Sequence, residues 1–406
     1  MLRQGGCGAG GGFCSPRALI ISLSIMTELK RKGRISGVAV TICFLAVIAC
    51  AAVLGYRKPM GNWDMLGYAG VAFSADSSEY DSIHHRTYST AKVALRELFD
   101  SPASPPDYGY ADDMRNNAAH FTEQLPFYSN RLGYILLLRF LRKFGLDFFT
   151  GMRLVSAASF FLLGPVTLLW MTRLKVPVGF AAPVSTLMLL SPHMLGLCRL
   201  GTPDAISTLC VTTGLYLVSE TNVQGLGIGL SLGSLLLRTD SIVLFLFILG
   251  YLACTRTPAG KLPARVAVGT GAAAVGLVLA INRLSGTYGL ATLFHHTFVT
   301  LMKTPGETKV AMTPALYLSG IRRLFGELLG RQFFLLSMLI GCLALASSFT
   351  PRNKNMCLAL FGAVLARLIV FPCPEDRFFA TAGIVFVVVA SANVTTSPAF
   401  TNSPHV

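Results

Sequence analysis

The chain has 406 residues, of which 53% are hydrophobic and only 13% are charged, and its mean hydropathy is +0.59. A soluble domain usually carries about a quarter charged residues, so this composition excludes an ordinary soluble protein and predicts a polytopic membrane protein. The net charge of +15 does not indicate a nucleic-acid partner, because the basic residues lie in short stretches between apolar runs, as membrane topology requires.

The apolar runs, such as Ile35–Gly55 and Phe379–Ala392, are continuous and do not alternate with polar residues. This pattern predicts transmembrane helices and not a barrel, so we expect an all-α transmembrane bundle of about ten spans. The predicted spans cover residues 35–56, 149–170, 178–197, 203–219, 225–238, 240–254, 265–283, 331–349, 355–371 and 378–393.

One transmembrane domain, residues 35–393, accounts for nearly the whole chain. Residues 1–34 are expected to be a disordered cytoplasmic extension, and residues 394–406 a short tail. The basic run Lys30–Arg34 before the first span predicts that the chain starts in the cytoplasm. Residues 57–148 and 284–330 then become two non-cytoplasmic loops.

The first of these loops is predicted to have helices of its own. Asp64–Phe73 has helical character, and Thr87–Phe99 reads as an amphipathic helix. Leu132–Phe144 is apolar but crowded by basic residues, which predicts a helix lying at the membrane interface. We therefore expect juxtamembrane helices beside the bundle.

Acidic residues are concentrated on the same side of the membrane. Of the 19 acidic residues, 10 lie between Asp64 and Glu123, and Asp204, Asp240 and Glu375 fall at the outer ends of predicted spans. Topology alone does not require this bias, since acidic residues contribute little to orientation. The pattern predicts a working site at the non-cytoplasmic surface.

Asp64 is the leading candidate for chemistry. It lies a few residues beyond the first span, next to Trp63 and one helical turn from Tyr68. A carboxylate at the headgroup layer meets a lower dielectric than water and suits the role of a general base, whereas the alternative is a helix N-cap. We take Tyr68 as a substrate-binding residue on the same helix face.

Asp76 and Glu79 form a second acidic group, which could bind a divalent cation or a hydroxylated substrate, or simply face solvent. Asp204 follows Pro203 at the start of a predicted span, where it either stabilises the helix N-terminus or belongs to the site. No residue is assigned as a metal ligand.

Arginines at the predicted outer boundaries complete the candidates. Arg238 with Asp240, and Glu375 with Arg377, lie at two span ends, and Arg131 precedes the interfacial helix. A guanidinium can bind a phosphate through two parallel hydrogen bonds, although such residues also anchor helix ends or pair with a neighbouring acid.

The order of several segments resembles a known family. NWDMLGYAG is followed by LPFYSNRLGYILLLRFLRKFG, then GMRLVSAASFFLLGPVTLLWMTRLK and TPDAISTL. This layout, over residues 60–240, is similar to that of the polytopic glycosyltransferases of the GT-C class, which includes protein O-mannosyltransferases and bacterial aminoarabinose transferases.

The resemblance implies an inverting transfer of one sugar from a polyprenyl-phosphate donor to a glycan, lipid or protein acceptor. It places the protein in the bacterial plasma membrane with its active site on the periplasmic side. Asp64 would be the general base, and Arg238 and Arg377 would stabilise the leaving phosphate. The acidic pair of some relatives is not adjacent here, because Asp76 and Glu79 follow Asp64 by 12 and 15 residues, so the participation of a divalent cation stays open.

Two other classes fit the same composition. A membrane transporter of a lipid or small solute would show ionisable groups at broken helices near the bilayer centre. A polysaccharide polymerase or ligase would depend on outer-loop arginines and a histidine, so replacing Asp64 by Asn would leave it active.

Overall fold

The computed structural model describes residues 37–95, 109–330 and 349–396, and this part of the chain folds into helices without a named strand. The all-α prediction is therefore confirmed. The predicted extension 1–34, the predicted span 331–349 except for its last residue, and the end of the tail lie outside the described residues.

The helices form two sets, a bundle and a group of loop helices. The bundle consists of α2 (Gly37–Arg57), α9 (Phe148–Arg173), α10 (Val178–Leu189), α11 (Pro192–Arg199), α12 (Asp204–Glu220), α13 (Gln224–Leu237), α14 (Ile242–Cys254), α15 (Ala264–Leu284), α19 (Pro351–Val370) and α20 (Ala380–Thr396). The loop helices are α3 (Trp63–Ser74), α4 (Tyr80–Leu95), α6 (Tyr110–Asn116), α7 (Ala118–Gln124), α8 (Leu132–Arg142), α16 (Leu290–Phe298) and α17 (Pro314–Gly330). Three short 3₁₀ helices complete the helical elements of the described residues: η1 (Leu125–Phe127), η2 (Thr239–Ser241) and η4 (Asp376–Phe378).

Several helices are long and apolar, as a membrane protein requires. Among the described residues, α2, α9, α15 and α19 are long enough to cross a bilayer, and α10 with α11 makes a fifth candidate that bends by 65°. The helices α13 and α20 and the η2–α14 segment are apolar but shorter. The expected count of about ten spans is therefore not established, whereas the membrane character is supported.

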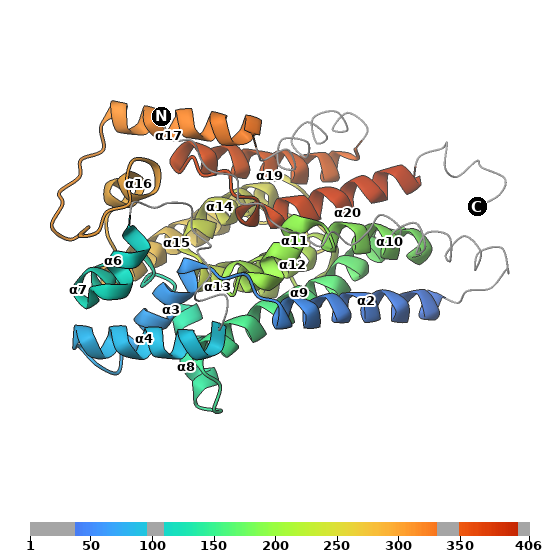
Figure 1. Cartoon of the computed structure of the whole chain (residues 1–406). Coiled ribbons are helices and arrows are strands. Elements are labelled where there is room, and N and C mark those ends of the chain that lie inside the picture. The colour runs from blue at the N-terminus through green and yellow to red at the C-terminus, as the bar shows by residue number, and fades with distance from the viewer. Residues whose placement is uncertain (1–36, 96–108, 331–348, 397–406) are drawn as a thin grey trace.

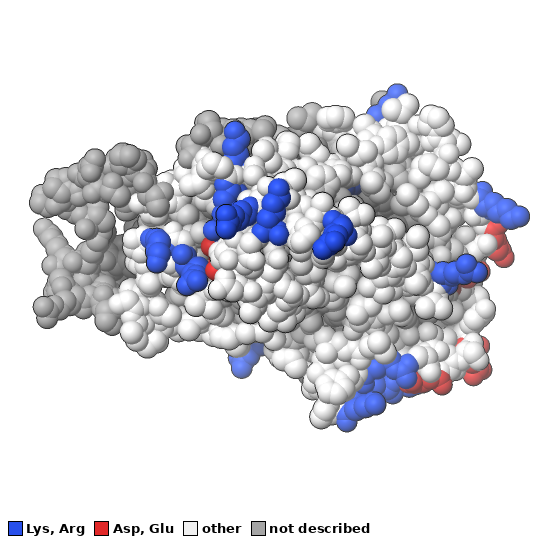
Figure 2. Space-filling view, turned by 180° about the vertical axis from the view of Figure 1, so that it is seen from behind, with Lys and Arg blue, Asp and Glu red and all other residues white. Residues whose placement is uncertain are grey.

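The loop helices gather at one end of the bundle (Figure 1). We call this the loop end; it carries α3, α4, α6 and α7, while the start of α2 and the end of α20 lie at the opposite end. On the face seen in Figure 2, acidic side chains lie chiefly at the right-hand end, which is the loop end in that view.

The predicted loop helices exist, with one shifted boundary. The expected helix Thr87–Phe99 is α4, which already begins at Tyr80 and is described as far as Leu95. The earlier start follows from its polar first turn: the Ser77 hydroxyl accepts a hydrogen bond from the Glu79 N–H, and Asp81 lies where the helix dipole favours an acid.

Packing of α8 fixes the turn that leads into α12. The Tyr134 side chain on α8 is fully buried, and its hydroxyl donates to the Gly201 carbonyl at 3.0 Å. Gly201 has a φ of 63°, a left-handed conformation that favours glycine, and it allows the sharp turn before Asp204. The segment between α2 and α9 thus helps to position the start of α12.

Candidate functional site

Arg377 joins three carboxylates from distant parts of the chain. Its guanidinium lies 3.0 Å from the Asp64 carboxylate and 3.6 Å from that of Asp204, and it also contacts Glu375. Burial acts to lower the pKa of Arg377, but the charges of Asp64 and Glu375 outweigh it and raise the pKa. A permanently charged group therefore holds the start of α3, the start of α12 and η4 together.

Asp64 is not the helix N-cap. That position belongs to Asn62, whose side-chain oxygen accepts a hydrogen bond from the Asp64 N–H at 3.1 Å. The Asn62 amide and Arg377 both contact Oδ2 of Asp64, at 3.3 and 3.0 Å. The side chain is 24% exposed, so Oδ1 is left as the oxygen that an incoming hydroxyl could approach.

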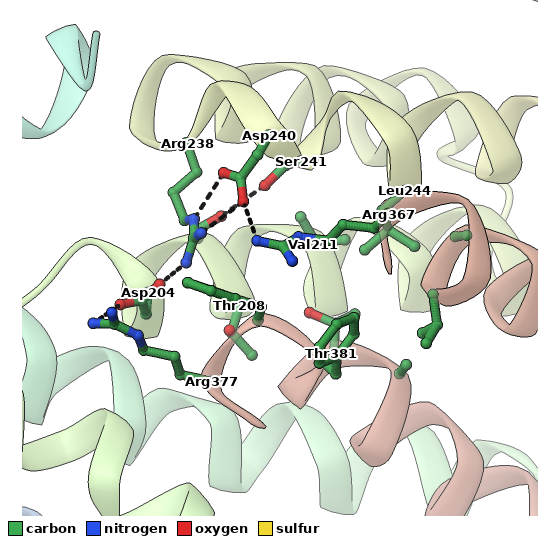
Figure 3. Close-up of a pocket in the computed structure, with 16 residues that line it drawn as sticks. Asp204, Thr208, Val211, Arg238, Asp240, Ser241, Leu244, Arg367, Arg377 and Thr381 are labelled. Atoms are coloured by element: carbon green, nitrogen blue, oxygen red, sulfur yellow. Dashed lines mark hydrogen bonds and ion pairs between the residues drawn. The ribbon is translucent and has the colours of Figure 1, made fainter. Parts of the chain in front are cut away.

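A chain of alternating charges runs from Asp204 into the bundle (Figure 3). Asp204 is buried, accepts a hydrogen bond from the Thr202 hydroxyl and pairs with Arg238. Arg238 binds Asp240 with two parallel hydrogen bonds of 3.0 and 2.7 Å, and Arg367 donates to the same carboxylate at 3.0 Å. The buried acid, Asp204, thus lies against the charges of Arg238 and Arg377, and such pairing offsets the cost of burying a charge.

These charges line one end of a pocket between α12, α14, α19 and α20. The cavity volume of the pocket is about 50 Å³, and the pocket opens to solvent. Its lining combines the charged groups with the hydroxyl-bearing side chains Ser207, Thr208, Ser241 and Thr381 and with the apolar side chains Val211, Leu244, Ala363, Val364, Phe378, Phe379 and Ala382.

Phe378 supports the arginines. The guanidinium carbons of Arg367, Arg238 and Arg377 lie 4.2, 4.4 and 5.0 Å from the centroid of its ring. Cation–π contacts of this kind hold guanidinium planes in a fixed orientation. Because one nitrogen of Arg367 is buried with no hydrogen-bond partner among the described residues, the pocket holds an unused donor for an anion.

Tyr68 and Arg131 lie beside Asp64 on the loop side of this cluster. The Tyr68 ring packs edge-on against Tyr128 and Tyr134, with centroid distances of 5.3 Å in both cases. Burial raises the pKa of Tyr68, a change that the charge of Arg131 opposes and that of Asp64 reinforces. Tyr68 therefore stays a neutral hydroxyl donor.

Most of the sequence-predicted candidates are brought together, and two are not. The residues that meet at or beside the site are Asp64, Tyr68, Arg131, Asp204, Arg238, Asp240, Glu375 and Arg377. Asp76 instead lies beyond the far end of α3, a helix about 18 Å long at 1.5 Å per residue, and Glu79 is exposed. Asp76 and Glu79 are therefore not part of the Asp64 cluster.

Arg367 is the site residue that the sequence analysis missed. It falls inside the predicted span 355–371, whereas the candidate residues of the bundle all lie at the ends of predicted spans. An ionisable side chain within an apolar helix is itself a signal of function, and this signal could have found Arg367. Within the described parts of the chain, no three His, Cys, Asp or Glu side chains converge in a way that could hold a metal.

Comparisons with known proteins add no identification. No family model matches the chain, and neither a curated protein nor a solved structure matches it significantly.

Proposed function

We propose that the protein is a membrane glycosyltransferase. In this proposal it transfers a sugar from a polyprenyl-phosphate donor to a hydroxyl group of a glycan, lipid or protein acceptor at the non-cytoplasmic face of the bacterial plasma membrane. Asp64 is the general base, and the pocket that contains Arg238 and Arg367 receives the donor phosphate.

The observation that carries the proposal is the double role of Arg377. Its guanidinium contacts Asp64 at 3.0 Å and also lines the pocket with Arg238 and Arg367. A candidate base and a cationic pocket are thus separated by one side chain. This is the arrangement that an in-line displacement needs, with an activated nucleophile on one side of the sugar and a stabilised leaving group on the other.

The proposed step balances as a single displacement. Oδ1 of Asp64 takes the proton of the acceptor hydroxyl, and the acceptor oxygen forms a bond to the anomeric carbon. The bond between that carbon and the phosphate oxygen breaks, the lipid phosphate leaves with the electron pair, and the anomeric configuration inverts. Arg238 and Arg367 stabilise the negative charge that develops on the phosphate.

The lining of the pocket also suits a donor anchored in lipid. Apolar side chains such as Val211, Leu244 and Val364 line the same pocket as the arginines. A polyprenyl chain is a hydrocarbon and gains free energy by leaving water for an apolar surface. The charged and the apolar groups of the lining therefore match the two halves of the donor.

The test uses the purified full chain in proteoliposomes with a panel of radiolabelled polyprenyl-phosphate sugars and hydroxyl acceptors. We expect loss of labelled donor together with a labelled acceptor product. Comparison of the lipid-linked sugars that accumulate in cells lacking the protein identifies the donor to include. No cleavage of any accumulated donor would contradict the proposal.

A transporter is the second candidate, because α10 and α11 form a broken helix with a 65° bend. The same proteoliposomes separate the two functions. A transporter moves the intact donor or solute across the bilayer, whereas a transferase breaks the bond between sugar and phosphate. The polymerase or ligase alternative predicts, in addition, that Asp64→Asn keeps its activity.

A further inference from the structure

Helix α8 exposes an apolar stripe that no described residue covers. Leu136, Phe140 and Phe144 are 65%, 54% and 70% exposed, and the rings of the last two lie 5.0 Å apart. Tyr134 and Leu138, on the opposite side of the helix, are buried against the protein. The helix thus packs one apolar side on the protein and presents a second apolar side outward.

The direction of α8 suits a membrane interface. The helix runs across the direction of the bundle helices at the loop end, and its C-terminal turn protrudes from the body of the molecule (Figure 1). Amphipathic helices that lie in the plane of a bilayer bury their apolar side at the boundary between headgroups and acyl chains. Contact with lipid would therefore account for the exposure of these apolar side chains.

Beside this stripe, three arginines share one carboxylate. Asp76 lies 2.7 Å from Arg142, 3.2 Å from Arg86 and 3.3 Å from Arg139. Burial acts to raise the pKa of Asp76, but the hydrogen bond from Arg142 and the charges of the three arginines outweigh it, so the net shift is downward. The group therefore keeps an excess positive charge next to the apolar stripe.

The guanidiniums are held in place and still have unused donors. Arg86 stacks on the Phe73 ring at 4.6 Å, and Arg142 stacks on Phe73 and Phe148 at 5.2 and 5.1 Å. The two arginines border an open pocket whose polar lining includes the hydroxyls of Ser89 and Thr90. Five N–H groups on each guanidinium exceed what one carboxylate can accept.

Asp147, the acid of this pocket, is already engaged by the protein. Its carboxylate caps α9 by accepting a hydrogen bond from the Thr150 N–H at 2.9 Å. In Figure 2, where the helices α4 and α8 lie at the lower right, Lys and Arg side chains gather beside acidic ones at the surface. The surface therefore offers a tetrahedral anion the fixed guanidiniums, whereas the hydroxyls of Ser89 and Thr90 already donate to the Arg86 carbonyl.

We propose that this surface binds the phosphate headgroup of an anionic phospholipid. Arg86, Arg139 and Arg142 contact the phosphate, and the acyl chains cover the apolar stripe on α8. Because a headgroup phosphate is bonded to its acyl chains through glycerol, one lipid can satisfy both neighbouring surfaces. This site is separate from the Asp64 cluster and does not depend on the proposed enzymatic function.

The experiment measures lipid binding to the full chain in detergent by native mass spectrometry, with phosphatidylglycerol and phosphatidylcholine as probes. We expect the wild-type protein to retain phosphatidylglycerol in preference. The double variant Arg139→Gln/Arg142→Gln should lose about tenfold or more of this affinity, since each basic residue near an anionic surface contributes about fivefold. Arg283→Gln is the matched control, because Arg283 is an exposed arginine at the end of α15.

Two further variants keep the test decisive. Arg139→Glu alone changes a partly exposed arginine that stacks on no ring among the described residues, so it should weaken phosphatidylglycerol binding even if the double variant fails to fold. Phe140→Ser/Phe144→Ser should weaken binding through the acyl chains. Equal phosphatidylglycerol affinity in Arg139→Glu and wild type would overturn the proposal, as would binding of inorganic phosphate that matches binding of the lipid.

Discussion

At the scale of single residues, the site depends on charges that cannot be removed independently. Arg377 contacts Asp64, Asp204 and Glu375, and Asp240 is shared by Arg238 and Arg367. Deleting one partner of a buried pair leaves an uncompensated charge, which typically costs about 3–5 kcal/mol. Variants that keep the polarity and the approximate size of the side chain are therefore more informative here than alanine substitutions.

Arg367 provides such a comparison. Arg367→Gln should raise the KM for the lipid-linked donor about 10- to 100-fold, because a hydrogen bond to a charged group contributes about 1.5–3 kcal/mol. Asp240 keeps Arg238 as its partner in this variant, so the fold should survive. Arg367→Lys keeps the charge but not the two parallel N–H donors of a guanidinium, so its KM should lie between those of the wild type and Arg367→Gln. An unchanged KM in Arg367→Gln would remove this residue from the donor site.

His296 should make the loop end sensitive to acid. Burial lowers the pKa of His296 to about 4, with a further contribution from His295, and its Nδ1 accepts a hydrogen bond from the Met302 N–H at 3.0 Å. The unfolded chain binds a proton near pH 6.5 but the folded chain only near pH 4, so stability should fall as the pH drops through this window. Thermal unfolding between pH 6.5 and 5 tests this before most carboxylates titrate.

Two variants separate His296 from other titrating groups. His296→Asn should flatten the dependence of the unfolding temperature on pH, because Asn offers an acceptor that does not titrate. His85→Gln, at an exposed histidine of α4, should keep the wild-type slope. A wild-type slope in His296→Asn would show that another group is responsible.

At the scale of elements, α12 and α13 approach each other closely through Gly214 and Gly227. A Cβ on Gly227 would lie 2.6 Å from the Gly214 carbonyl oxygen and 2.6 Å from a methyl group of Val218. Small residues that let backbones approach are characteristic of helix contacts in membranes. This pair supports both Asp204 at the start of α12 and Arg238 at the end of α13.

Alanine substitutions along α13 should therefore have opposite effects. Gly227→Ala should lower the free energy of unfolding by about 1–3 kcal/mol, because the new methyl group meets backbone atoms of Gly214 and Val218 and a methyl group of the short, branched Val218 side chain. Gly229→Ala, in the same helix with nothing within 4 Å, should leave stability unchanged or raise it by up to about 1 kcal/mol. Unfolding in detergent checks both, and equal effects of the two substitutions would rule out the close contact.

The sequence predicted the positions of the helices better than the breaks and contacts between them. Continuous apolar runs predicted helices α2, α9, α15 and α19 within a few residues, because hydropathy is a local property. The break between α10 and α11 was missed even though Pro192 marks it, since the apolar run continues through the bend.

Pairing within the site could be predicted only in part. A bias of acids toward one side correctly suggested that Asp64, Asp204 and Arg377 would lie at the same end, although 313 positions separate the first from the last. The sequence offered no way to separate Asp76 from this group, because its partners Arg139 and Arg142 come from another helix. Such pairings follow from tertiary packing.

At the scale of the whole molecule, the proposed function requires that the loop end and the opposite end of the bundle face different compartments. Lys92 is an exposed residue of α4, a helix of the loop end, and Lys354 is an exposed residue in the first turn of α19, which is expected to begin at the opposite face. Basic residues such as Arg256, Lys261 and Lys354 follow the positive-inside pattern if the loop end faces outward.

Cysteine labelling tests this orientation. In intact cells, a reagent that cannot cross the membrane should label Lys92→Cys and leave Lys354→Cys unlabelled, whereas both should react after the membrane is opened. The parent chain, with its native cysteines, supplies the background. Labelling of Lys354→Cys in intact cells would reverse the assignment of the two faces.

The central claim is that the Asp64 carboxylate deprotonates the acceptor, and the most direct measurement compares sugar transfer by Asp64→Asn and Asp112→Asn in the same proteoliposomes. Asp112 is an exposed acid of α6 and serves as the matched control. We predict that Asp64→Asn lowers the turnover number by about 10²- to 10⁴-fold, as expected for loss of a general base, while Asp112→Asn transfers sugar at the wild-type rate. Transfer by Asp64→Asn at the wild-type rate would contradict the account.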